Sequence, residues 1–214
     1  MKKLVLVLLA SLFVISGSTQ VFGQSKLERK RDRAKAQSAS KLVKRLKKEG
    51  WIIDSQTLTL EEAILDHKVK LEKDENNFEL VGRVSGVSSR NVAHNNANHN
   101  AAIAYAQLAK KSMLRGAEES NVGSIGGEEF DNFTGAYERL VAGSLEKELK
   151  ESFAIYKEGP GGKKEYNVYY IVNEDKAAQL RINAMNKAIE ETKLSQEFAD
   201  RISSFVRDKF DAGE

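Results

Sequence analysis

Three histidines are the residues best suited to chemistry in this cysteine-free chain of 214 residues: His67, His94 and His99. Two of them bound the run His94-Asn95-Asn96-Ala97-Asn98-His99, which looks like a metal-binding motif. On a helix, residues five positions apart are separated by about 140°, whereas helical metal sites place histidines three or four positions apart. We therefore expect no metal site here and interpret the asparagines as a polar helix face.

Other candidate sites lack the pattern that their chemistry requires. The stretch Gly123-Ser124-Ile125-Gly126-Gly127 has neither the Gly-Lys-Ser/Thr end of a phosphate-binding loop nor a preceding strand, so it predicts a connector between helices. No Gly-x-Ser-x-Gly elbow occurs, and no Ser or Thr lies beside a His as an activated nucleophile would. Three acidic pairs are typical of solvated helix faces: Glu118-Glu119, Glu128-Glu129 and Glu190-Glu191.

We accordingly expect no catalytic residues, no cofactor and no metal. The absence of cysteine removes disulfides, thiol catalysis and thiolate metal sites together. An enzyme whose site is assembled from scattered residues stays open as the alternative, and a deep pocket with converging polar groups would favour it.

The first two dozen residues are typical of a secretory signal peptide. Lys2 and Lys3 precede a short apolar stretch, Leu4 to Ile15, and Val21-Phe22-Gly23 suits signal peptidase. The apolar stretch is shorter than the roughly 20 residues that span a bilayer, which disfavours an uncleaved anchor. We predict a signal peptide over residues 1–23, cleavage between Gly23 and Gln24, and an exported product. Lipid anchoring is not expected, because a lipoprotein needs a cysteine at this point.

Charge is divided along the chain. Between Lys26 and Lys48 there are eleven Lys or Arg residues against Glu28 and Asp32, a net charge of +9. Residues 49–214 carry 21 basic and 29 acidic residues, a net charge of −8. Such a division of charge bears on which partners the chain attracts and does not determine its fold.

Residues 24–50 are predicted to form a basic helical arm. They contain no Pro, and the single Gly stands at the end as Gly50, where a helix would stop. An apolar stripe at helical spacing marks the second half of the arm: Ala39, Leu42, Val43 and Leu46.

Three interpretations of the arm compete. Its stripe could pack on the rest of the chain while the lysines face water. It could instead hold an anionic surface, such as lipid head groups or acidic polysaccharide. Nucleic-acid binding is not expected, because the arm lacks aromatic residues and export removes the usual partners. The candidate residues for the anionic surface are Lys41, Lys44, Arg45, Lys47 and Lys48.

Residues 51–214 are predicted to form a single α+β domain. Phe78 to Ser88 alternates as a strand, with Gly82 and Gly86 on the same face as three apolar residues. A long helix follows from Ser89 to about Glu119, and its stripe of alanines lets it approach a sheet closely. We therefore expect this helix to cross the face that carries the glycines.

The remaining elements follow from periodicity and turn chemistry. Thr59 and Glu62 form a capping box for a short helix, and a second helix is expected from roughly Phe130 to Lys150. A hairpin is predicted from 152–157 to 165–172, and its turn holds the only proline. Asn173 is suited to cap the next helix, and a last helical stretch presents an apolar stripe: Leu194, Phe198, Ile202, Phe205 and Val206.

Together these elements predict a small antiparallel or mixed sheet of three to four strands, packed by long helices mainly on one side and preceded by the basic N-terminal helix.

The order strand, alanine-rich helix, helix, hairpin, helix resembles the LPP-twenty-like family, the small bacterial envelope proteins typified by a twenty-kilodalton lipoprotein. The resemblance covers about residues 78–190. It is carried by Gly-x-Val-Ser-Gly at 82–86, Ala-Ala-x-Ala-Tyr-Ala-Gln-Leu-Ala at 101–109 and Lys-Glu-Tyr-Asn-Val-Tyr-Tyr-Ile-Val at 164–172. It implies an exported, non-enzymatic envelope protein with no catalytic residues to carry over. The chain departs from the family in having no cysteine to lipidate, so a lipid tether is not implied.

We therefore expect an exported interaction module of the cell envelope, in the periplasm or outside the cell. Its partner is expected to be another envelope protein or an anionic surface. No nucleic acid and no membrane span after signal removal are expected.

Overall fold

The computed structural model describes residues 26–119, 127–193, 196 and 199–200, with side chains described only from residue 37 onward and not at 116–119. By its internal contacts the chain forms two compact units, Met1–Ser38 and Ala39–Glu214. The predicted signal peptide over 1–23, residues 123–126 of the glycine-rich connector and the last apolar stripe from Leu194 to Val206 lie outside the described residues.

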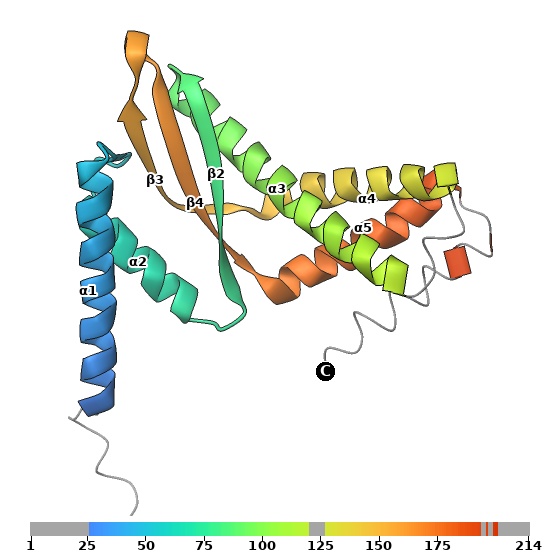
Figure 1. Cartoon of the computed structure of the whole chain (residues 1–214), viewed down its shortest axis with the longest axis horizontal. Helices are drawn as coiled ribbons and strands as arrows, with labels where there is room; N and C mark the ends of the chain where they lie inside the picture. Colours follow the sequence, from blue (N-terminus) through green and yellow to red (C-terminus); the bar gives the residue numbers. More distant parts are fainter. Residues whose placement is uncertain (1–25, 120–126, 194–195, 197–198, 201–214) are drawn as a thin grey trace, which may run out of the picture. The chain divides into compact units, whose positions relative to one another are not determined.

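The described part of the chain is α+β, as predicted (Figure 1). Its helices are α1 (Lys26–Lys48), α2 (Leu60–Glu72), α3 (Arg90–Glu119), α4 (Gly127–Glu148) and α5 (Glu174–Thr192). Its strands are β1 (Ile52–Ile53), β2 (Asn77–Val87), β3 (Lys150–Glu158) and β4 (Lys164–Asn173). All four strands form one antiparallel sheet in the order β1-β3-β4-β2.

The predicted hairpin between β3 and β4 is confirmed. Pairing runs from Glu158 opposite Lys164 to Lys150 opposite Ile171, and Pro160–Gly162 forms the turn between the strands. Gly161 and Gly162 have positive φ, at 69° and 71°, which glycine adopts at little cost. β2 then pairs along the other edge of β4, with Phe78 opposite Val172.

The helix α3 crosses the face of β2 that carries Gly82, as predicted. A Cβ atom added at Gly82 would lie 1.9 Å from the carbonyl oxygen of Ala97, so no larger residue fits between this strand and α3. The second glycine behaves differently. Gly86 has a φ of 75° where the register shifts between Val84 and Val87, and open space lies above it. Gly86 therefore permits an irregularity of the strand, and Gly82 alone permits the close approach.

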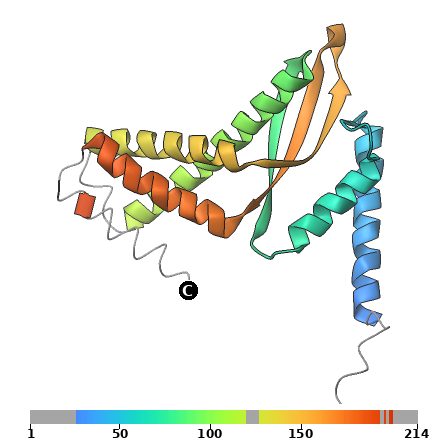
Figure 2. The ribbon, with the colours of Figure 1, turned by 180° about the vertical axis from the view of Figure 1, so that it is seen from behind.

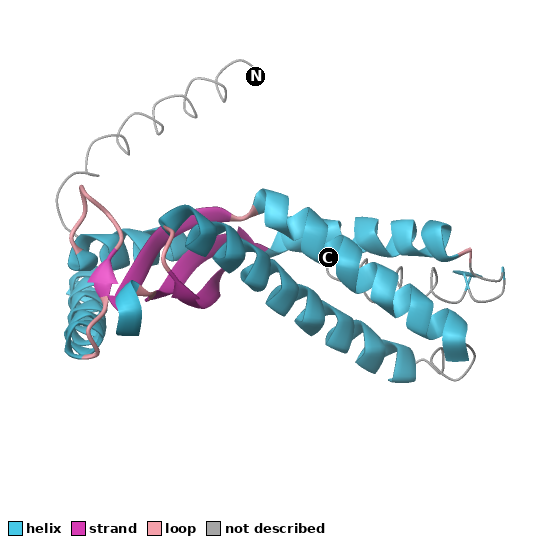
Figure 3. Ribbon diagram, turned by 90° about the horizontal axis from the view of Figure 1, so that it is seen from above, coloured by secondary structure: helices cyan, strands magenta, loops and turns pink. Residues whose placement is uncertain are grey.

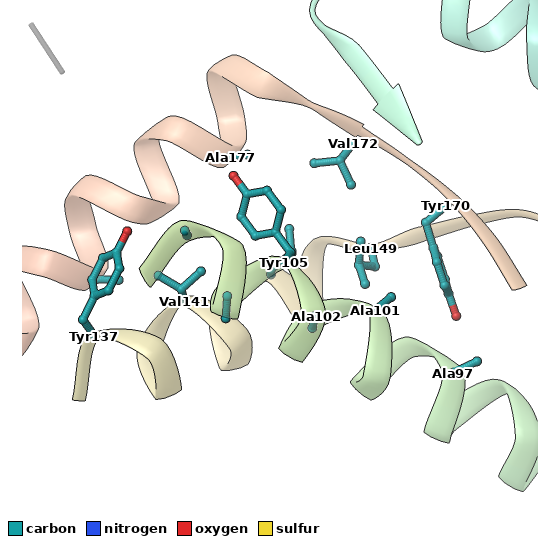
Figure 4. Packing of buried hydrophobic residues seen from close by; sticks show 14 of the residues in the cluster. Ala97, Ala101, Ala102, Tyr105, Tyr137, Val141, Leu149, Tyr170, Val172 and Ala177 are labelled. Atoms are coloured by element: carbon teal, nitrogen blue, oxygen red, sulfur yellow. The ribbon is translucent and has the colours of Figure 1, made fainter. Parts of the chain in front are cut away.

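The larger apolar core lies between this face of the sheet and the helices α3, α4 and α5. The helix α4 packs against both α3 and α5, and the three helices continue beyond the sheet (Figure 3). Small residues of α3 such as Ala97 and Ala101 meet the sheet, while Tyr105 of α3 and Tyr137 of α4 point toward α5 (Figure 4). The alanines thus let α3 approach the sheet, and the two tyrosines fill the space toward α5.

The opposite face of the sheet is also covered, contrary to our expectation of helices mainly on one side. Phe153 and Ile155 of β3 belong to a second buried cluster, together with residues of α2 and of the second half of α1. The helix α2 lies on the other side of the sheet from α3 (Figure 2). Ala39, Val43 and Leu46 of α1 are buried in this second core, together with Trp51, Leu60, Ala63 and Ile64. The predicted apolar stripe of the arm, from Ala39 onward, is therefore packed in the second core.

The helix ends follow the predicted capping chemistry. The Thr59 hydroxyl accepts a hydrogen bond from the Glu62 backbone amide at 3.2 Å, and the Glu62 carboxylate accepts one from the Thr59 amide at 2.8 Å. Asn173 caps α5 by accepting from the amide of Lys176. Among the helices of the described ranges, none is both long enough and apolar enough to span a membrane.

Candidate functional site

The cationic face of α1 is the first candidate site. Lys41, Lys44, Arg45, Lys47 and Lys48 are all exposed. Four of them recur at i, i+3, i+4 and i+7, which places them along one side of the helix. Arg45 approaches Glu49 at 3.9 Å, and none of the four lysines forms an ion pair with a described carboxylate.

The opposite side of the same helix segment holds this face in place. Val43 and Leu46 are buried against the sheet, so the lysines cannot turn inward without breaking the second core. Lys47 and Lys48 also stand in the last turn, where the helix dipole favours positive charge. The result is a fixed row of cations whose charges are available to an anionic partner.

The second candidate is a partly buried ionic cluster around His94. Its Nδ1 lies 2.7 Å from Oε2 of Glu151 in β3, and its Nε2 lies 2.6 Å from Oδ2 of Asp54, which follows β1. Arg90, one turn earlier on α3, donates through Nε to both carboxylate oxygens of Asp54, at 2.9 and 2.8 Å. The rings of His94 and Tyr166 of β4 form a T-shaped pair, with the ring centroids 5.9 Å apart.

This environment raises the pKa of His94 above its usual value. The hydrogen bond to Glu151 is the largest cause, burial opposes it, and the hydrogen bond to Asp54 adds to the increase. Burial is substantial because only 16 % of the His94 side chain and 13 % of the Asp54 side chain are exposed. The cluster can hold a positive charge on the imidazole.

The rest of the polar run on α3 is used in separate contacts. His99 lies 3.2 Å from Glu146 of α4, Asn98 donates to the backbone oxygen of Glu146, and Asn100 donates to the backbone oxygen of Arg83 in β2. His94 and His99 therefore face different partners, as their five-residue spacing predicts. Within the described residues, no group of three or more His, Asp or Glu side chains is arranged to hold a metal ion.

His67 is the third histidine and lies in the second core. Its side chain is almost fully buried, its Nε2 lies 2.7 Å from Glu79, and its ring meets Phe153 and Tyr169 edge-on. Its Nδ1 has no hydrogen-bond partner among the described residues. The structure makes His67 part of the buried face of α2.

An open groove of about 510 Å³ lies between β2, α3 and α5. Phe78, Leu80 and Leu108 line it with apolar surface, and Tyr105, Glu174 and Arg181 supply its polar wall. Arg181 donates to the Tyr105 hydroxyl and to Glu174, the latter at 2.6 Å, so its charge is already compensated. The groove thus offers a ligand mainly apolar contact.

Compared with known proteins, the chain matches no family model, no curated protein sequence and no solved structure. The function proposed below is therefore inferred from the chain's own residues.

The cationic residues were found from the sequence, whereas the His94 cluster was not. His94 was noticed only as a metal candidate, because its partners lie 40 and 57 positions away along the chain. The sequence did show a histidine beside the alanine stripe of a long helix. That position indicates a polar contact but does not identify the residues that make it.

Proposed function

We propose that this protein is a non-enzymatic interaction module that binds an anionic surface through the cationic face of α1. The observation that carries the proposal is the exposure of Lys41, Lys44, Arg45, Lys47 and Lys48 on a helix whose other side is buried. Binding through a helix fixed in this way costs little conformational entropy, because the backbone is already ordered before the partner binds.

The residues of α1 favour electrostatic binding at a surface over insertion of the helix into a bilayer. The exposed side of α1 between Lys41 and Lys48 carries cations and no exposed large apolar residue. An amphipathic helix that enters a bilayer needs an apolar face directed at the lipid, and here that face is occupied by the protein core. The expected ligands are therefore anionic lipid head groups or acidic polysaccharide, bound at their surface.

The proposed setting is the cell envelope. It is supported by the signal-type sequence over residues 1–23 and by the resemblance of residues 78–190 to LPP-twenty-like envelope proteins. Export is tested by N-terminal sequencing of the protein recovered from its native cells. A product that begins at Gln24 is expected, and a product that retains residues 1–23 would contradict export by cleavage.

Binding is tested with vesicles containing phosphatidylglycerol and with a soluble acidic polysaccharide, each over a range of salt concentrations. A variant with Lys41, Lys44, Arg45, Lys47 and Lys48 changed to Gln should bind at least about a hundredfold more weakly, since each cation contributes roughly 1 kcal/mol near an anionic surface. Gln resembles Lys in helix propensity, so α1 should stay folded.

The matched control removes the same charge from exposed lysines elsewhere on the molecule: Lys111, Lys147, Lys150, Lys163 and Lys187. This control should keep most of the binding, and binding of the wild type should weaken steeply with added salt. Equal loss in both variants would show that net charge alone matters and would contradict a site on α1.

A protein partner is the second candidate, favoured by the net charge of −8 over residues 49–214. Crosslinking in intact cells distinguishes the two. A partner captured by both the wild type and the α1 variant would place binding on the acidic part of the molecule.

A further inference from the structure

The ring of His94 lies between two carboxylates that come from different segments of the chain. Nδ1 is 2.7 Å from Glu151 and Nε2 is 2.6 Å from Asp54. A neutral imidazole carries one N–H, and an ionised carboxylate can only accept hydrogen bonds. Two such contacts at these distances need a donor at each nitrogen, so this geometry requires the doubly protonated, positively charged ring.

We propose that His94 is a proton-dependent clamp, which in its protonated form fastens the segment Asp54–Thr59, directly after β1, to α3 and β3 and releases that segment when the proton is lost. The proposal is independent of the partner suggested for α1, because it concerns contacts within the fold.

The backbone alone attaches this segment weakly to the sheet. β1 pairs with β3 at only two positions, Ile52 opposite Tyr156 and Ile53 opposite Ile155, and the amide of Asp54 adds one hydrogen bond of 2.9 Å to Ala154. The next residues, 55–59, contain exposed side chains and precede α2. The ionic contacts of Asp54 with His94 and Arg90 are therefore a large share of what fixes the end of β1.

The groups that face His94 come from four elements. Asp54 and Glu151 attract a positive ring, and Tyr166 is an aromatic neighbour of it. Arg90 carries the same charge as the protonated ring, but it is bonded to Asp54 and its side chain is 58 % exposed, which weakens its opposition. The four charges cancel while His94 is protonated, and deprotonation leaves a net negative cluster with a nitrogen lone pair facing a carboxylate.

The sign of the pH dependence follows. The two carboxylates raise the pKa of His94 in the folded protein. A raised folded pKa stabilises the folded state fully below the unfolded value of about 6.5, and this contribution is lost as the pH rises through the folded value. The clamp is therefore closed while the pH lies below the raised pKa of His94 and both carboxylates are ionised, and it opens as the pH rises through that pKa.

The direct test is a titration of the histidine ring nitrogens of the ¹⁵N-labelled protein by NMR. Both nitrogens of His94 should be protonated at pH 6, and the titration midpoint should lie above the value of about 6.5 of an unperturbed histidine. A midpoint at or below 6.5, or an unprotonated ring nitrogen at pH 6, would overturn the proposal.

Opening is measured by hydrogen exchange of the Asp54 amide at pH 6 and pH 9, corrected for the intrinsic pH dependence of exchange. In the wild type, opening should become about tenfold more frequent for each unit by which the folded pKa exceeds the unfolded one. His94→Gln should exchange rapidly at both values, whereas the control His99→Gln should follow the wild type because the contact of His99 with Glu146 of α4 lies outside the His94 cluster. Unchanged pH dependence in His94→Gln would assign the effect to another group.

A second variant covers the case in which His94→Gln does not fold. Asp54→Asn keeps a polar group at this position but removes one of the two negative charges, so it should lower the titration midpoint of His94. An unchanged midpoint in Asp54→Asn would also contradict the clamp.

Discussion

Gly82 is the residue at which β2 and α3 come closest. Changing Gly82 to Ala should destabilise the protein by about 3 kcal/mol or more, because the new methyl group would meet the backbone of Ala97, which cannot rotate away as a side chain could. The measurement is urea unfolding. Gly135→Ala is the control, since Gly135 is helical with open space around it, and it should stabilise by roughly 0.5–1 kcal/mol. Equal effects at both sites would contradict the close approach.

Two buried tyrosines allow a comparison of a satisfied and an unsatisfied hydroxyl. The hydroxyl of Tyr137 has no hydrogen-bond partner among the described residues, and burial strongly raises the pKa of this side chain. Tyr137→Phe should therefore leave the free energy of unfolding unchanged or raise it by up to about 1 kcal/mol. Tyr105→Phe should lower it by about 1 kcal/mol, because it removes a hydrogen bond from Arg181. Calorimetry of both variants checks the difference, and a large loss in Tyr137→Phe would indicate a partner for its hydroxyl.

Residue-level chemistry was only partly predictable. The capping box at Thr59 and Glu62 was predictable because both partners lie within one turn of the chain. The cluster of His94 with Asp54 and Glu151 was not, because sequence spacing carries no information about partners that only the folded sheet brings together.

The second half of α1 is the element that joins the cationic face to the fold. Leu46→Ala should destabilise the protein by about 2–4 kcal/mol, because Leu46 is 5 % exposed and its loss leaves a cavity in the second core. Lys47→Ala on the neighbouring exposed position should change stability by less than about 0.5 kcal/mol. Chemical denaturation followed by Trp51 fluorescence checks both, since Trp51 is buried in the same core. A small effect of Leu46→Ala would mean that α1 is not anchored there.

Elements with strong local signals were predicted well. The alternation of β2, the glycine-flanked proline between β3 and β4, and the alanine stripe of α3 each identify one conformation. What periodicity cannot state is which helix covers which face of the sheet. Phe153 and Ile155 alternate with Ala154 along β3, and only the topology shows that their side faces α1 and α2.

At the scale of the whole molecule, the fold should depend on α1 from Ala39 onward and not on the residues before Ser38. The contacts that bury Ala39, Val43 and Leu46 lie within the unit Ala39–Glu214. A chain that begins at residue 37 should therefore unfold cooperatively with nearly the stability of the longer protein. A chain that begins at Trp51 should lose several kcal/mol, because it exposes the second core. Thermal unfolding of both chains is the measurement, and equal stability would contradict this role of α1.

The alanines of α3 have one further consequence, for the uniqueness of the fold. Ala93, Ala97 and Ala101 repeat every four residues, so α3 displaced by one turn would still present a small residue to Gly82 at nearly the same energy. Apolar packing alone would therefore leave two or three alignments of this helix close in energy. The polar side chains distinguish them, because only one alignment satisfies all of their partners at once: His94, Asn98 and Asn100. The polar segment from His94 to Asn100 would then determine which alignment of α3 forms during folding.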